Sequence, residues 1–207
     1  MTEQSLPGWL DDLASAAPAP GGGAAAAMSA ALGAALVEMV ANLTIGKSTY
    51  AEHQQHVESV LAEATQLRHS AVALVDADAE AFTALMATYK LPKETDEQKA
   101  VRRAEIQRAT AAAAEVPLQI GRVGAQVVDL AAQLPGRSNP NVLSDVAVAA
   151  SSAVAAIESA AVNVEINLSG IRDKEVAGGI AERLAELEAV AERGRALVTE
   201  VRAELTR

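Results

Sequence analysis

The sequence predicts an all-α protein, an up-and-down bundle of about six helices in a single domain over residues 1–207. Half of the residues are apolar but only 2% are aromatic, so alanine, valine, leucine and isoleucine must fill the core. Alanine is the best helix former and a poor strand former. Proline and glycine divide the chain into segments of helical length. We therefore expect closely spaced helices rather than a sheet.

Helix boundaries follow from residues that start or stop helices. Pro7 can begin a first helix, and the proline and glycine run at residues 18–23 ends it. Gly46 closes the second helix. Asn139 is a suitable N-cap with Pro140 at the first helical position of the fifth. The predicted helices cover residues 7–16, 24–44, 50–90, 96–133, 140–168 and 177–205.

The fourth and sixth helices carry further signals. Thr95 and Gln98 have the spacing of a capping box, and Pro117 predicts a kink within the fourth helix. The sixth helix keeps a heptad of apolar or small residues, which predicts either an outer helix or a dimer-forming one. Its positions are Ile180, Leu184, Leu187, Ala191, Gly194, Val198, Val201 and Leu205.

Composition excludes several classes of function. A net charge of −10 argues against nucleic acid as a partner. The absence of cysteine and of a signal-peptide pattern predicts a cytoplasmic protein without disulfides. Residues 24–43 are long enough to span a membrane, but they are mostly alanine and contain Glu38 and Asn42. We interpret them as a buried helix of a soluble bundle.

The fifth helix carries a polar stripe at helical spacing, and this stripe is the main candidate for chemistry. Close packing of small residues would explain the serines equally well. Asp145 differs because it lies in the first turns, where the helix dipole stabilises a carboxylate among apolar neighbours. It is a candidate general acid or base. The stripe consists of Asp145, Ala149, Ser152, Ala156, Ser159, Asn163 and Asn167.

Other polar residues have a structural and a functional interpretation. Asp78 lies on the apolar seam of the third helix, where it either pairs with a cation or does chemistry. Glu38, Asn42 and Lys47 either form an internal polar network or contribute to a site. The three histidines, at positions 53, 56 and 69, have no carboxylates around them that would complete a metal set, so we expect no metal.

Gly21, Gly22 and Gly23 lead directly into the second helix. Backbone N–H groups at such a start can bind an anion. The run lacks the Lys-Ser/Thr of a P-loop, so a nucleotide site is not expected.

Six phrases, in this order and at these spacings, resemble the cyclodeaminase/cyclohydrolase family. This family comprises the C-terminal domain of formiminotransferase-cyclodeaminase and stand-alone bacterial methenyltetrahydrofolate cyclohydrolases. The resemblance covers about residues 6–168. The phrases are APAPGGG at 17–23, VANLTIGK at 40–47, DADAEAF at 76–82, LPK at 91–93, SDVA at 144–147 and NVEINL at 163–168.

The resemblance implies an all-helical homodimer or higher homo-oligomer with a tetrahydrofolate derivative as substrate and no cofactor. It points to Asp145 as the acid/base group, Asp78 as a second carboxylate and Lys47 as an electrostatic or proton-relay partner. The chain departs from the family at Ala24, where a small hydroxyl residue commonly follows the glycines. The substrate-binding candidates are Gly21, Gly22, Gly23, Asn42, Lys93, Arg102, Ser144 and Asn163, with Lys93 and Arg102 for the anionic glutamate tail.

Three functions remain open at this point. The first is a methenyltetrahydrofolate cyclohydrolase, favoured because the sequence contains this region without a transferase region. The second is a formiminotetrahydrofolate cyclodeaminase that releases ammonia. The third is a non-catalytic helical dimer that binds folate or a partner protein.

Overall fold

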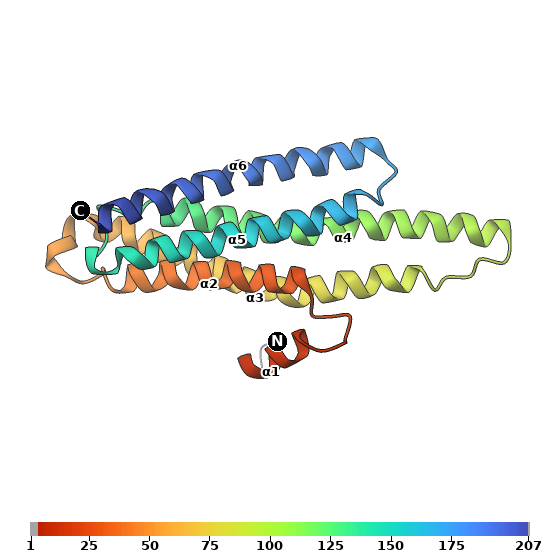
Figure 1. The fold of residues 1–207 in the computed structure, drawn as a ribbon, viewed down its shortest axis with the longest axis horizontal. Coiled ribbons are helices and arrows are strands. Elements are labelled where there is room, and N and C mark those ends of the chain that lie inside the picture. The colour runs from red at the N-terminus through yellow and green to blue at the C-terminus, as the bar shows by residue number, and fades with distance from the viewer. Residues whose placement is uncertain (1–3, 207) are drawn as a thin grey trace.

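The computed structural model describes residues 4–206, and within them the chain forms six α-helices and no strand (Figure 1). The predicted all-α fold is therefore confirmed. Two short 3₁₀ segments, η1 (Ser48–His53) and η2 (Pro140–Val142), precede the third and fifth helices. The helices are α1 (Leu6–Leu13), α2 (Gly22–Asn42), α3 (Gln54–Thr88), α4 (Asp96–Ala131), α5 (Leu143–Leu168) and α6 (Lys174–Leu205).

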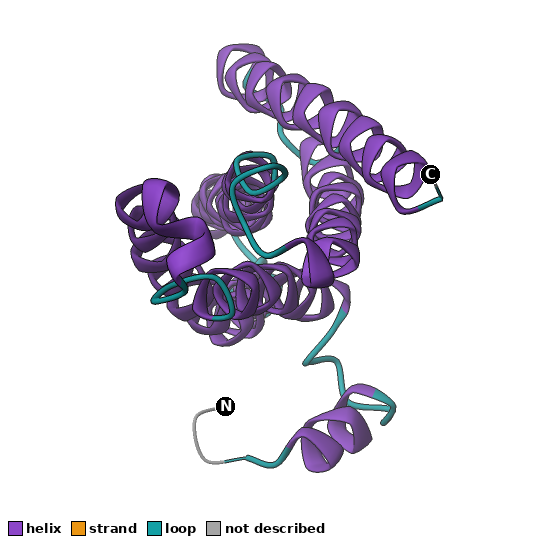
Figure 2. Ribbon diagram, turned by 90° about the vertical axis from the view of Figure 1, so that its left-hand side faces the viewer, coloured by secondary structure: helices purple, strands orange, loops and turns teal. Residues whose placement is uncertain are grey.

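Helices α2 to α5 form an elongated bundle, and α6 lies along α4 and α5 on its outside (Figures 1 and 2). Helix α5 is central because it packs against α2, α4 and α6. Helix α1 stands away from the bundle in both views. Trp9 and Leu13 hold it to the core, whereas Leu6 and Leu10 are exposed.

The core between α2 and α5 consists mainly of alanine, as the composition predicted. Ala27 and Ala30 on α2 and Ala149 and Ala153 on α5 are completely buried. A methyl group added at Gly33 would lie 3.0 Å from the carbonyl oxygen of Ala149. The two backbones therefore approach closely, which only small residues allow.

Helices α2 and α5 are each long and apolar enough to cross a membrane, by length and composition alone. The two spans, Gly22–Asn42 and Pro140–Leu168, are each more than half buried inside the bundle. This burial agrees with the interpretation of residues 24–43 as a buried helix.

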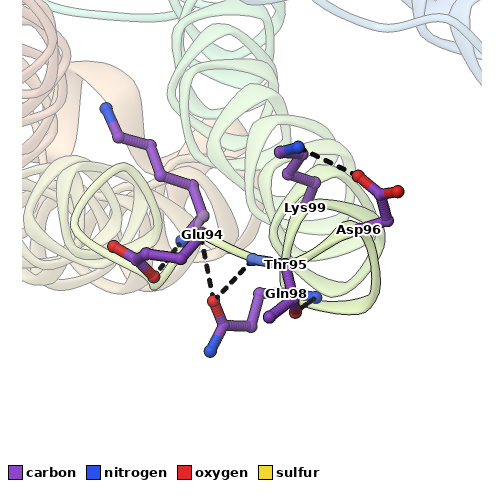
Figure 3. A network of polar contacts seen from close by, with 6 residues as sticks. Glu94, Thr95, Asp96, Gln98 and Lys99 are labelled. Carbon is purple, nitrogen blue, oxygen red and sulfur yellow. Dashed lines mark hydrogen bonds and ion pairs between the residues drawn. The ribbon is translucent and has the colours of Figure 1, made fainter.

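Helix α4 begins with the predicted capping box (Figure 3). The backbone N–H of Gln98 donates to Thr95 Oγ1 at 3.2 Å, and Gln98 Oε1 accepts from the backbone N–H of Thr95 at 3.1 Å. Lys99 and Asp96 form an exposed ion pair of 2.9 Å in the same turn. The helix continues through Pro117 to Ala131.

Three helix starts differ from the prediction by three residues or more. Helix α3 begins at Gln54 after η1, and α5 begins at Leu143 because Asn139 caps η2 instead. Helix α6 begins earlier than predicted, at Lys174, because the Asp173 carboxylate accepts from the backbone N–H groups of Glu175 and Val176. Apolar periodicity cannot predict the position of a capping residue that lies outside the apolar repeat.

The heptad seam of α6 faces the bundle. Ile180, Leu184, Leu187 and Val201 on this seam are buried, and the helix packs against α4 and α5. The seam is therefore the contact of an outer helix, the first of its two interpretations.

Glu38 forms an internal polar cluster, but not with the expected partners. Its carboxylate accepts from Arg68 Nε at 2.5 Å and from Thr65 Oγ1 at 3.1 Å, both on α3. Glu38 thus links α2 to α3, whereas Asn42 and Lys47 are exposed near the end of α2.

Candidate functional site

A cavity of about 520 Å³ lies where α2 begins and α5 ends, between these helices and the long α3–α4 pair. Its volume falls within the usual range for small-molecule sites. Asp78 and the three glycines at positions 21–23 supply polar groups on one side. Asn163 and Asn167 supply polar groups from α5.

The Asp78 side chain lies against the first turn of α2. The backbone N–H of Ala24 donates a hydrogen bond to its carboxylate. A Cβ atom at Gly23 would overlap the Asp78 carboxylate, so the carboxylate occupies the space of a missing side chain. Glycine at position 23 is therefore a steric requirement for the position of Asp78.

The environment of Asp78 makes it suitable for proton transfer. Burial raises the pKa of the Asp78 carboxyl above its ordinary value, and the hydrogen bond from Ala24 opposes this rise. Raised carboxyl pKa values are typical of groups that exchange protons near neutral pH.

The start of α2 offers donors to a ligand. Gly21 is the N-cap and has no side chain to satisfy the first N–H groups of the helix. Gly21, Gly22 and Gly23 all line the cavity. The Ala24 side chain is completely buried, and the group that Ala24 contributes to the site is its backbone N–H. This contribution does not require a hydroxyl side chain.

The two asparagines of α5 are fixed by the backbone. Asn163 Nδ2 donates to the carbonyl of Ser159 at 2.7 Å, and Asn167 Nδ2 donates to the carbonyl of Asn163 at 2.9 Å. These bonds orient both carboxamides at the cavity wall. Asn163 was predicted as a binding residue, and it lies beside Gly22.

An apolar wall completes the cavity, and the sequence reasoning did not identify it as a binding surface. It consists of Phe82 and Met86 on α3, Tyr89 directly after α3, Ile106 on α4 and Ile166 on α5. Phe82, Met86 and Tyr89 follow Asp78 at helical spacing and are exposed. The sequence signal that could have predicted this binding surface is a row of large apolar residues on the same helix face as a carboxylate.

Arg102 lies at the edge of this wall. Its guanidinium lies 5.9 Å from the centre of the Tyr89 ring and donates to the Tyr89 carbonyl at 3.1 Å. Because Tyr89 lines the cavity, Arg102 places a positive charge beside the cavity wall. Lys93 is exposed in the connection between α3 and α4.

The remaining predicted site residues lie at the other end of the bundle. Asp145 and Ser144 are in the first turn of α5, whereas Asn163 is near its last. The helical rise of about 1.5 Å per residue puts Asp145 roughly 27 Å from Asn163. Asn42 and Lys47 lie at the same end of the bundle as Asp145, because the backbone N–H of Asn139, which precedes α5, donates to Thr44 Oγ1 at 3.0 Å. Within one chain, the structure therefore brings Asp78 together with the glycines and Asn163, but not with Asp145 or Lys47.

Comparisons with known proteins agree with this architecture. The sequence model described as formiminotransferase-cyclodeaminase matches residues 5–186. A methenyltetrahydrofolate cyclohydrolase from Methylorubrum extorquens is 49% identical over 89% of this chain and 88% of its own length. A formimidoyltransferase-cyclodeaminase from Mus musculus is 36% identical over 84% of this chain, which corresponds to 32% of that longer protein.

A solved structure shares the whole fold. The crystal structure of formiminotetrahydrofolate cyclodeaminase from Thermotoga maritima superposes with a TM-score of 0.90 and 30% identity, covering 100% of this chain and 99% of that one. Sequence and fold together show that this chain belongs to the formiminotransferase-cyclodeaminase family.

Proposed function

We propose that the protein is a methenyltetrahydrofolate cyclohydrolase, which hydrolyses 5,10-methenyltetrahydrofolate to 10-formyltetrahydrofolate. The observation that carries this proposal is the 49% identity to the Methylorubrum cyclohydrolase, which extends over nearly the full length of both chains. The cavity around Asp78 supplies the chemistry that this reaction needs.

The reaction begins with water attacking the carbon that bridges N5 and N10 of the cationic substrate. Asp78, ionised and close to the cation, stabilises its charge and accepts a proton from the attacking water. The new C–O bond gives a tetrahedral carbon. The bond from this carbon to N5 then breaks, N5 takes up the hydroxyl proton, and the carbon remains on N10 as a formyl group. The net products are 10-formyltetrahydrofolate and one proton.

The cavity walls suit the rest of the substrate. The flat apolar side chains of Phe82 and Tyr89 can pack against the planar rings, and the carboxamides of Asn163 and Asn167 can hydrogen-bond their polar edges. Arg102, beside the wall residue Tyr89, suits the anionic glutamate tail.

The cyclodeaminase is the second candidate, favoured by the similarity to the Thermotoga maritima structure. In that reaction N10 attacks the formimino carbon and ammonia leaves. Asp78 would then deliver a proton to the leaving nitrogen, and the protein would act as a lyase.

The two reactions are separated by direct assay. Purified protein mixed with methenyltetrahydrofolate should accelerate the loss of its near-UV absorbance over buffer. Ammonia release from formiminotetrahydrofolate tests the second candidate. If neither reaction occurs but folate raises the melting temperature, the protein is a binding module.

The setting we propose is the cytoplasm, with a diffusing folate substrate, no nucleic acid, no cofactor and a homodimeric assembly. The acidic net charge of −10 supports the exclusion of nucleic acid.

A further inference from the structure

We propose that Gln107 is a positioning residue, which holds the end of α5 against α4 and thereby fixes one wall of the cavity that binds the substrate. This role deepens the proposed folate reaction and rests on it, because the wall matters only if the cavity holds the substrate.

The last turn of α5 and the residues directly after it form this wall. Ile166 and Asn167 line the cavity from the helix, and Ser169 and Gly170 line it from the turn that follows. Both turn residues are exposed, and α6 begins shortly afterwards at Lys174. Connections of this kind are more mobile than the helices that they join. A wall built on one therefore needs a tie to the bundle.

Gln107 on α4 supplies this tie through both ends of its carboxamide. Its Nε2 donates to the carbonyl of Gly170 at 2.9 Å, and its Oε1 accepts from the backbone N–H of Arg172 at 2.7 Å. Both distances are normal for hydrogen bonds of this type. The partners lie 63 and 65 positions away in the sequence, so the two bonds join separate elements. Together they orient the carboxamide and locate the turn relative to α4.

Gln107 acts from behind the cavity wall. Ile106 and Thr110 on the same helix line the cavity, whereas the Gln107 carboxamide is directed to the turn. Thr110 packs closely against Gly170, because a Cβ atom added there would lie 3.2 Å from Thr110 Cγ2. Gln107 and Thr110 are three positions apart and share one face of α4. This face thus receives the turn by close packing at Thr110 and by hydrogen bonds at Gln107.

Asn167 connects the tie to the bound substrate. Its Nδ2 donates to the carbonyl of Asn163 at 2.9 Å and to the carbonyl of Ala113 on α4 at 3.4 Å. With its amide hydrogens directed to backbone carbonyls, its Oδ1 can accept from an N–H group of the substrate. The bond to Ala113 is long, so the position of Asn167 relative to α4 depends on the shorter bonds that Gln107 makes just beyond it.

The expected effect of Gln107 is on binding rather than on the chemical step. Asp78, the proposed proton acceptor, lies against the first turn of α2 and not on the turn after α5. A looser wall weakens contacts that the substrate makes equally in the ground state and in the transition state. Such a loss raises KM and leaves kcat nearly unchanged.

Gln107→Met tests this role, because methionine has a similar length and a similar helix propensity but removes the amide donor and acceptor. The KM for methenyltetrahydrofolate should rise about 3- to 10-fold, as expected for the loss of two partly exposed neutral hydrogen bonds. The kcat should stay within about twofold of the wild type.

Gln126→Met is the matched control, because Gln126 is an exposed glutamine on the same helix, far from the turn. It should have the KM of the wild type. An unchanged KM in Gln107→Met, an equal rise in Gln126→Met, or a kcat that falls as far as kcat/KM overturns the positioning role.

A second variant separates the two hydrogen bonds. Gln107→Glu keeps an acceptor for the N–H of Arg172 but, when ionised at about pH 8, has no donor for Gly170. Gly170 is the partner that lines the cavity. Gln107→Glu should therefore raise KM as much as Gln107→Met does. A wild-type KM in Gln107→Glu overturns the assignment to Gly170.

Gly170→Ala shows whether Gln107 acts through the turn. The added methyl group presses on Thr110 and should push the turn away from α4, which weakens the same contact. In the double variant with Gln107→Met, the rise in KM should be smaller than the product of the two single effects. Fully multiplicative effects would show that Gln107 acts by another route.

Binding of 5-formyltetrahydrofolate, an isomer of the reaction product, separates this role from the reaction. Titration calorimetry gives its Kd without turnover. If the wild type binds this folate but does not hydrolyse methenyltetrahydrofolate, the proposed reaction is wrong. A Kd about 3- to 10-fold higher in Gln107→Met would then still support the tie. An unchanged Kd in Gln107→Met, or a wild type that does not bind this folate, overturns it.

Discussion

Asp78 has surroundings that oppose its ionisation, and this has a measurable consequence for stability. Its pKa in the folded protein lies above the unfolded value, so the unfolded chain ionises first as the pH rises. The ionised carboxylate therefore lowers the free energy of unfolding above the folded pKa. The effect vanishes below the unfolded pKa of about 3.9.

Asp78→Asn should thus separate activity from stability. We expect its cyclohydrolase rate to fall by about 10²- to 10⁴-fold, the usual contribution of a general base. At neutral pH its free energy of unfolding should equal or exceed that of the wild type, and this advantage should shrink as the pH falls toward 4. Urea unfolding at several pH values measures the difference. A variant that is less stable at pH 7 than at pH 4, relative to the wild type, contradicts the assignment.

Substitution of Gly23 should also lower the activity, although less than substitution of Asp78 itself. Gly23→Ala adds a methyl group where the Asp78 carboxylate lies, so the carboxylate must move. A displacement of this kind should reduce activity on the order of 10- to 100-fold. Gly178→Ala on α6, where an added Cβ meets nothing within 4 Å, is the matched control and should retain full activity.

At the residue scale, the sequence supplied candidate side chains for the site but not which of them meet. The acidic residue on the apolar seam of α3 identified Asp78 as a candidate, and the glycine run identified the start of α2. Their direct contact could not be predicted, because it depends on the position of α3 along the axis of α2. The separation of Asp145 from Asp78 could not be predicted either. A polar stripe identifies one face of a helix, but it does not indicate at which end of the bundle a site forms.

Helix α6 contains two glycines on which the same substitution should have opposite effects. Gly178 is open, so Gly178→Ala should raise the free energy of unfolding by about 0.5–1 kcal/mol through helix propensity. Gly194 faces the bundle, and an added Cβ would lie 2.5 Å from Val154 Cγ2. Gly194→Ala should therefore lower the stability by about 1–3 kcal/mol through overpacking.

Thermal unfolding measures both effects. A change of 1 kcal/mol corresponds to roughly 2–4 °C in Tm for a chain of this length. Equal shifts of the same sign for the two variants would contradict the close packing of α6 on α5.

At the element scale, residues with a local mechanism were predicted well. Thr95 and Gln98 fix the start of α4 through their own hydrogen bonds, so four consecutive residues contain the whole signal. The start of α6 depends on Asp173, which lies before the apolar repeat begins. The ion pair of Glu38 with Arg68 joins two helices and has no local signature, which is why nearby Asn42 and Lys47 were expected to be its partners.

The whole molecule is a bundle with one loosely attached helix. Helix α1 carries Trp9, the single tryptophan of the chain, and is held to the bundle by Trp9 and Leu13. Elements with few buried contacts open at lower free energy than the core. We expect tryptophan fluorescence to change at a lower urea concentration than far-UV circular dichroism. Coincident transitions would show that α1 unfolds together with the bundle.

The alanine core described between α2 and α5 also determines how the folding free energy is composed. Burying an alanine loses no rotamer entropy, whereas burying a longer side chain costs up to about 2 kcal/mol. Its small methyl group gains correspondingly little from leaving water. The interior of this protein is thus stabilised by many small gains with almost no ordering cost, so larger side chains should be tolerated there less well than in a leucine-rich core.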